Sequence, residues 1–317
     1  MAITTFGELR RELIREGITW TVNPNFGDDV TIPRFALGAD LTDWPKAETV
    51  PRVDVPALVA AAPTTNALLR NHLVERGLLE PLFLGEQRLV GSPGPTAKTG
   101  AIARTAGVGG IAPSGGGSAP SMVDWRNRFG WSWITGIRDQ DPCEHCWIYS
   151  ATALVEAMVR IEHCVWCPRS EGDYIEANRV PCGQCGDPGG VLSWVQSNGL
   201  ADLDCVPWVD RDPGDRSSAY WNPAPRGCGG GSMLAPPAWS PCGNRNGRTV
   251  KIPAYTSLGN VADEKHWIDA VGPLVVVFDV YSDFFGWSGN TPYVKSASAT
   301  YEGSHVVLAV GYDDGLG

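Results

Sequence analysis

The sequence lacks any run of 18 consecutive apolar residues, so no stretch is typical of a transmembrane helix. Its start, MAITTFGELRRELIREG, has the charged, amphipathic pattern of a helix and not the pattern of a secretory signal peptide, so we expect either that a signal has been removed or that the protein has none. Basic residues are few: 25 Lys and Arg stand against 35 Asp and Glu, a net charge of −10. Nucleic-acid binding requires an excess of Lys and Arg to neutralise phosphates, so we expect no nucleic-acid partner. We also expect no membrane partner, because no transmembrane helix is predicted.

The residues that are present are typical of a globular protein, with 43% hydrophobic and 19% charged positions in 317 residues. This length allows one large or two modest domains. Residues 93–121 are dominated by Gly, Ser, Ala, Pro and Thr and form no apolar face, which predicts a flexible linker. We therefore expect one unit at 1–92 and another at 122–317.

The segment QDPCEHCWIYS, at 140–150, precedes a helical pattern. Apolar residues recur there at steps of four and three, the spacing of one helix face: Trp147, Ala151, Leu154, Met158 and Ile161. Cys146 therefore lies at the first turn of a buried helix. The helix dipole and unpaired N–H groups at that end favour the thiolate, which is the nucleophilic form of cysteine. The alternative is a structural cysteine that caps a core helix.

Two sets of motifs resemble the papain-like cysteine proteases. The first set matches the start of the mature enzyme in that family: ValAspTrpArg at 123–126, Gln140, Cys143, Cys146, Trp147 and Ser150. The second is GlySerHisValValLeuAlaValGlyTyr at 303–312, which resembles the segment with the family's histidine and selects His305. The family usually has two small residues before the nucleophile, where this chain has Glu144 and His145.

The resemblance implies a role for each matched residue. Cys146 would be the nucleophile, His305 its acid–base partner, and Gln140 a donor to the oxyanion beside the backbone N–H of Cys146. The remaining candidates would bind substrate: Gly189, Gly190, Ser304 and Trp147. His145 is disfavoured as the base, because adjacent residues of a helix point about 100° apart. No metal or cofactor is implied.

The resemblance also implies an α+β fold with two lobes and a cleft between them. The helical lobe would contain helices at 146–162, from about 170, and within 186–196. The antiparallel, barrel-like lobe would contain strands at 249–256, 272–279 and 305–312, and a helix at 261–270. Residues 1–92, with helices at 5–16 and 56–79, would be a pro-segment that covers the cleft. An unrelated N-terminal domain is the alternative.

The chain has nine cysteines. The family's pattern implies a disulfide between Cys143 and Cys185, with Cys182 as a close competitor for Cys143. Many disulfides favour an oxidising compartment, so we expect a secreted or extracytoplasmic protein, with a cytoplasmic location as the alternative. A rival interpretation is a zinc site, because two CxxC pairs have suitable spacing: Cys164, Cys167, Cys182 and Cys185.

The predicted function is hydrolysis of peptide bonds in peptides or proteins by a Cys146–His305 dyad, held as a zymogen. The alternatives are a peptide-binding protein of the same fold with weak chemistry, and a transpeptidase. The family's Asn-Ser-Trp-Gly motif does not occur before the sequence ends at Gly317, so we nominate no third catalytic residue. We expect the chain to be a fragment of a longer protein. In one interpretation, a second polypeptide supplies the strands that the fragment lacks.

Overall fold

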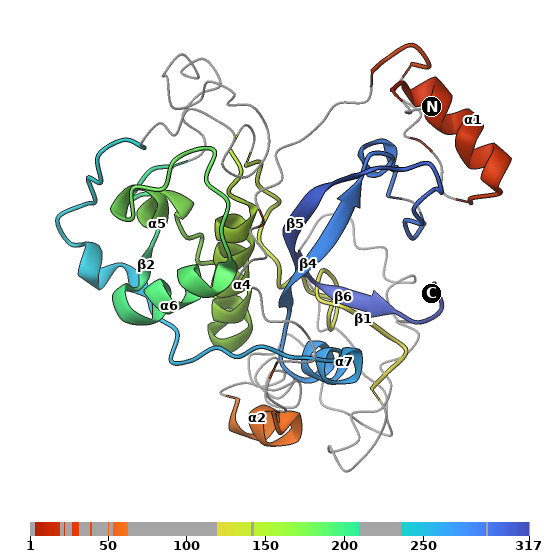
Figure 1. Ribbon diagram of the computed structural model, residues 1–317. Helices are drawn as coiled ribbons and strands as arrows, with labels where there is room; N and C mark the ends of the chain where they lie inside the picture. Colours follow the sequence, from red (N-terminus) through yellow and green to blue (C-terminus); the bar gives the residue numbers. More distant parts are fainter. Residues whose placement is uncertain are drawn as a thin grey trace, which may run out of the picture.

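The computed structural model describes residues 4–19, 22, 27–31, 39, 50, 53–62, 119–140, 143–208, 236–289 and 291–316. Most of the linker predicted at 93–121 lies outside these ranges, as does most of the helix predicted at 56–79. The described residues form a helical lobe and a strand-rich lobe that meet where α4 (Cys146–His163) packs on β5 (Tyr301–Ala309) (Figure 1). Within the described part of the chain, no helix has the length and apolar character needed to cross a membrane.

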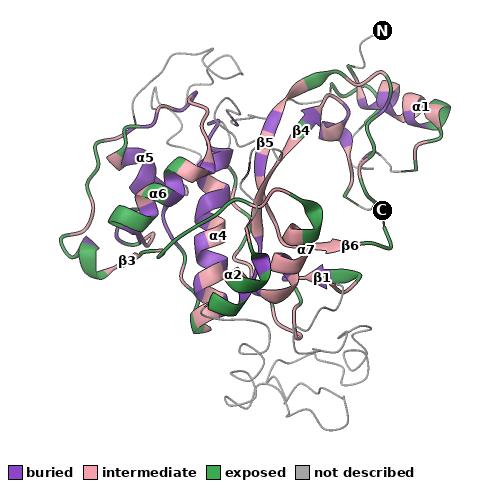
Figure 2. Ribbon diagram, turned by 60° about the horizontal axis from the view of Figure 1, so that its bottom comes forward, coloured by how far each residue is buried: buried purple, intermediate pink, exposed green. Residues whose placement is uncertain are grey.

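The helical lobe is built on α4, in which 11 of 18 residues are buried (Figure 2). It packs against α5 (Glu171–Ala177) and α6 (Pro188–Asn198) on one side and against β4 (Leu274–Tyr281) and β5 on the other. Because both sides are covered, α4 buries more than the single face that its periodicity predicted. All three helices predicted for this lobe are present.

The strand-rich lobe contains an antiparallel pair, β4 with β5, in which Phe278 lies opposite His305. The strand predicted at 305–312 is divided near Val310, because β6 (Gly311–Asp313) pairs instead with β1 (Met122–Asp124). Helix α7 (Val261–Ala270) forms as expected. The strand predicted at 249–256 is only two residues long, β3 (Thr249–Val250), and it pairs with β2 (Leu200–Ala201).

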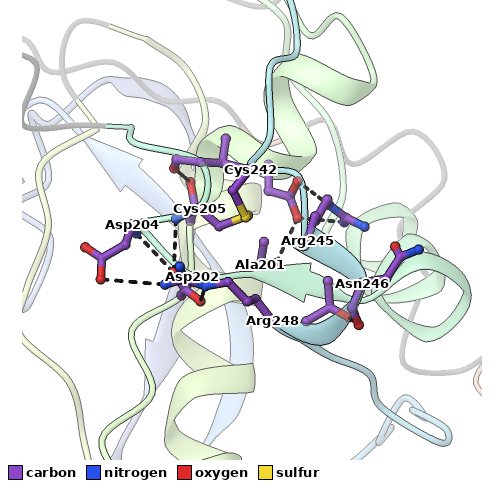
Figure 3. The surroundings of a disulfide bond; sticks show 12 residues. Ala201, Asp202, Asp204, Cys205, Cys242, Arg245, Asn246 and Arg248 are labelled. Atoms are coloured by element: carbon purple, nitrogen blue, oxygen red, sulfur yellow. Dashed lines mark hydrogen bonds and ion pairs between the residues drawn. A yellow bond between two sulfur atoms is a disulfide. The ribbon is translucent and has the colours of Figure 1, made fainter.

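A disulfide and two Arg–Asp ion pairs attach the segment from 236 to 250 to the helical lobe (Figure 3). Cys205 and Cys242 form the disulfide, and Arg248 pairs with Asp202 beside it. Arg245 makes two hydrogen bonds to the fully buried carboxylate of Asp173, at 2.7 and 2.8 Å. These contacts fix a segment in which β3 is the only strand.

The described N-terminal residues pack on the strand-rich lobe at two places (Figure 1). Helix α1 (Phe6–Glu16) begins at a capping box formed by Thr5 and Glu8, and its apolar side packs on Val280 and Phe285. Helix α2 (Val55–Ala61) packs on α7. The two helices lie at opposite ends of the lobe (Figure 1). Residue 39 lies between them in the sequence.

Candidate active site

Cys146 is the first residue of α4 and is 1% exposed. It is a thiol, as are Cys164 and Cys167. The N-terminal end of a helix favours negative charge, and Cys146 lies at that end of α4, where the sequence pattern placed it. The backbone oxygen of Gln140 accepts a hydrogen bond of 2.9 Å from the N–H of Cys143, which lies three residues before Cys146.

His305 lies on β5, and its ring makes an edge contact with the ring of Phe278 at a centroid distance of 5.8 Å. Burial lowers the pKa of His305. Its Nδ1 atom is buried and has no hydrogen-bond partner among the described residues. Buried polar atoms are usually paired, so the unpaired Nδ1 of His305 is an exception, and a catalytic role is one of its explanations. Because α4 packs on β5, the structure brings the elements of Cys146 and His305 together.

The structure changes which glycine lies at the cleft. Gly189 and Gly190 are in the first turn of α6, where both N–H groups donate to the carboxylate of Asp187, at 2.7 and 3.3 Å. Both N–H groups are therefore used in the cap of α6, whereas the resemblance implied contacts with an extended substrate. Gly186 instead forms a parallel β-bridge with Ala39, whose N–H donates to the backbone oxygen of Ser304 at 3.4 Å. Ala39 thus lies between the two lobes.

The side chains of Trp147 and Ser304 point into the protein, which differs from the substrate contacts predicted for them. Trp147 is 4% exposed and meets the ring of Tyr174 edge-on. It packs directly behind Gly186, where an added Cβ would lie 2.7 Å from the indole ring, so only glycine fits there. The hydroxyl of Ser304 is hydrogen-bonded to Asp279 at 3.0 Å. Trp147 therefore supports the cleft wall from behind.

The disulfide predicted between Cys143 and Cys185 is wrong, because Cys143 is joined to Cys182. The N–H of Glu144 donates to the oxygen of Cys182 at 2.9 Å, and this backbone pairing brings Cys182 to Cys143 with a Cα–Cα distance of 4.6 Å. Cys185 is also disulfide-bonded. A cysteine in a disulfide is not a thiolate ligand, so the four-cysteine zinc site is not formed either.

The sequence reasoning missed a buried charge cluster beneath α4. The guanidinium of Arg138 bridges the carboxylates of Glu156 and Glu171, both of which are 1% exposed. Burial raises the pKa of Glu171 to about 7, although Arg138 acts in the opposite direction. Glu156 also accepts hydrogen bonds from the Thr135 hydroxyl and the backbone N–H of Arg169. Only the glutamate within an otherwise apolar helix face could have indicated this cluster.

The family model for papain family cysteine proteases matches residues 119–316. Among curated proteins, the chain is 24% identical over 209 residues to Pro-cathepsin H of Mus musculus, covering 63% of this chain and 54% of that protein. It is 26% identical over 208 residues to Procathepsin L of Felis catus, covering 61% of this chain and 51% of that protein. The chain thus spans about half the length of the curated relatives it matches.

One solved structure also resembles the whole described fold. It is a digestive procathepsin L2 proteinase from the larval midgut of Tenebrio molitor, with a TM-score of 0.53 and 17% sequence identity, covering 96% of this chain and 73% of that one. This likeness supports the papain-like two-lobed fold. The family match covers more than half of the sequence and includes the segments of Cys146 and His305. The chain therefore belongs to the papain family of cysteine proteases.

Proposed function

We propose that the chain hydrolyses peptide bonds in peptides or proteins, with Cys146 as the nucleophile and His305 as its acid–base partner. The observation that carries this proposal is the packing of α4, which begins with Cys146, on β5, which contains His305. The N-terminal end of α4 favours the thiolate, and His305 as imidazolium would stabilise it further. The chemistry needs no metal or organic cofactor.

In the proposed reaction, the thiolate attacks the carbonyl carbon and negative charge develops on the carbonyl oxygen. The side-chain amide of Gln140 and the backbone N–H of Cys146 donate to this oxygen, and losing one such donor typically lowers kcat by about 10²–10³-fold. The imidazolium of His305 gives its proton to the leaving amine. A water molecule, deprotonated by His305, then hydrolyses the thioester and restores the thiol.

The test is a comparison of two cysteine variants. Cys146→Ala is expected to abolish peptide hydrolysis and the rapid labelling by iodoacetamide at neutral pH, while the protein remains folded. Cys167→Ala removes another thiol of the same lobe and is expected to retain activity. Wild-type hydrolysis by Cys146→Ala would overturn the assignment. Adding an amine acceptor and analysing the products separates hydrolysis from transpeptidation.

We also propose that the N-terminal segment is a pro-segment that blocks the cleft. Its Ala39 occupies the position between Gly186 and the backbone of Ser304, where an extended substrate would pair. Helix α1 is fitted closely to its site, because an added Cβ at Gly286 would lie 2.5 Å from Leu9. Further hydrogen bonds attach α1, from the N–H of Ala297 to Glu16 and from the hydroxyl of Ser298 to Glu12, each 2.7 Å.

A cleavage experiment tests the blocking role. A recognition sequence for a specific protease is inserted within 93–118, the chain is cut there, and the N-terminal piece is removed by size exclusion. We expect the rate of peptide hydrolysis to rise after removal. Equal rates before and after removal would contradict the proposal. We further propose an extracytoplasmic location, because five of the described cysteines are disulfide-bonded.

A further inference from the structure

Three consecutive residues before the nucleophile are attached to the neighbouring segment at 181–182. Cys143 is joined to Cys182 by the disulfide, and the N–H of Glu144 donates to the oxygen of Cys182 at 2.9 Å. The third link is a side-chain contact, in which Nε2 of His145 lies 2.9 Å from the oxygen of Pro181. We call these three links the 143–145 clamp. It ends one residue before Cys146.

The imidazole of His145 fits this contact as a neutral hydrogen-bond donor. The residue is 1% exposed, and burial lowers its pKa to about 4. The neutral ring has one N–H, and a carbonyl oxygen can only accept, so the contact requires the tautomer with the proton on Nε2. Its direction towards Pro181 also explains why His145 is not the general base of the site.

His145 is connected to α4 as directly as to Pro181. It is the N-cap residue, and its backbone oxygen accepts from the N–H groups of Ile148 and Tyr149 at 2.8 and 3.1 Å. Its side chain makes no hydrogen bond to the helix, unlike that of a Ser, Thr, Asp or Asn cap. The ring is therefore committed to Pro181, while the backbone of the same residue sets the first turn of α4.

We propose that His145 is a positioning residue, whose hydrogen bond to Pro181 fixes the Cys146 thiol relative to the cleft wall that contains Gly186. This inference rests on the proposed role of Cys146 as nucleophile. The wall follows closely in sequence, because Gly186 comes five residues after Pro181. A small residue at 145 could not reach Pro181 with its side chain, so this chain uses a link that the small pair of the family does not provide.

The disulfide and the backbone bond of Glu144 remain when the side chain of His145 is changed, so the fold is expected to persist. Without the hydrogen bond to Pro181, the first turn of α4 is expected to gain conformational freedom. A displacement of about 1 Å between reacting groups can cost up to about 100-fold in rate. We therefore expect His145→Ala to lower kcat by about 10- to 100-fold, with KM little changed, because Gly186 and Ser304 are not altered.

Two conservative variants separate positioning from packing. His145→Gln places an amide N–H near the position of Nε2 and can restore the bond to Pro181, whereas His145→Asn is too short to do so. His163→Ala is the control, because this histidine lies at the other end of α4 and its side chain is 66% exposed. We expect activity close to wild type for His145→Gln and His163→Ala, and low activity for His145→Asn.

The experiment measures kcat per titrated Cys146 thiol, KM and the rate of alkylation of Cys146 in the chain freed of its N-terminal segment. Low kcat per thiol in His145→Ala and His145→Asn, with recovery in His145→Gln, supports the inference. Equal kcat per thiol in all variants overturns it, as does a glutamine variant no better than asparagine. If His145→Ala does not fold, the comparison of His145→Gln with His145→Asn decides whether the inference holds. A wild-type chain with an unreactive Cys146 would overturn the proposed function itself, and the inference with it.

Discussion

The two sides of the cleft are stabilised in different ways. On the helical side, Cys146 follows the 143–145 clamp and begins a helix that packs on α5 and α6 of its own lobe as well as on β4 and β5. On the strand side, most residues of β4 and β5 are only half-buried (Figure 2). Their core includes three residues of α1, which pack with Val280 and Phe285: Phe6, Leu9 and Leu13.

This difference indicates what each lobe needs in order to stay folded. The helical lobe holds its nucleophile with its own disulfides and buried ion pairs. The strand-rich lobe shares its apolar core with the N-terminal segment at two sites, α1 on η5 (Phe284–Gly286) and α2 on α7. Removing the segment would therefore free Gly186 and the backbone of Ser304 from Ala39 and would also expose apolar surface of the lobe that carries His305. Activation and stability are expected to change together.

The largest effect is expected in the helical lobe. Asp173→Ala leaves the buried guanidinium of Arg245 without its carboxylate partner, and breaking a buried ion pair in this way typically costs about 3–5 kcal/mol in the free energy of unfolding. It also removes acceptors for the N–H of Ala201 and the indole of Trp239. Urea unfolding measures the change. Arg126→Ala breaks an exposed pair with Asp124 and is expected to cost less than about 1 kcal/mol. Equal losses of unfolding free energy in Asp173→Ala and Arg126→Ala would contradict the claim that buried ion pairs stabilise the helical lobe.

The next effect concerns the shared core of the strand-rich lobe. Leu9→Ala removes a fully buried side chain of α1, and such changes typically cost about 2–5 kcal/mol. Thermal unfolding of the intact chain should show this loss. After cleavage of the linker, the same variant should release the N-terminal piece more readily. Ile14→Ala, on the exposed side of the same helix, is expected to change stability by less than about 0.5 kcal/mol. If both variants release the piece equally, α1 is not the anchor.

A smaller effect should appear as a pH dependence of stability. Two carboxylates share the guanidinium of Arg138, and burial raises the pKa of Glu171 from its ordinary 4.5 to about 7. The folded chain then holds this proton more tightly than the unfolded chain does. The contribution to stability is full below pH 4.5 and is lost as the pH rises to about 7. Glu171→Gln keeps the size and does not titrate, so its stability should vary less over this range. An unchanged pH dependence of unfolding would contradict the prediction.

Local patterns in the sequence predicted the helices better than they predicted the contacts between segments. The spacing of apolar residues after Cys146 predicted α4, and Asn260 with Asp263 gives α7 a conventional start. For Gly189 and Gly190, the sequence contained a local signal of a helix start that was not used. Asp187 followed by Pro188 is typical of a helix start, and it moves Gly189 and Gly190 into α6.

Other features depend on tertiary structure and could not be predicted from spacing. The resemblance favoured Cys185 over Cys182 as the partner of Cys143, and the backbone bond at Glu144, which selects Cys182, is not visible in the sequence. The pairing of Asp173 with Arg245 joins residues 72 positions apart. The role of His145 depends on the direction of its ring, which the sequence does not indicate. The positions of Cys146 and His305 were predicted because motifs, rather than packing, identified them.

The most direct test of the account is the rate of Cys146 alkylation as a function of pH, in chains freed of the N-terminal segment. Iodoacetamide labelling is located by mass mapping, and the wild type is compared with His305→Ala and His163→Ala. We predict rapid labelling of Cys146 at neutral pH in the wild type and His163→Ala. In His305→Ala, rapid labelling should begin only at the higher pH at which an unassisted thiol ionises. The same pH profile in all three proteins would contradict a Cys146–His305 dyad.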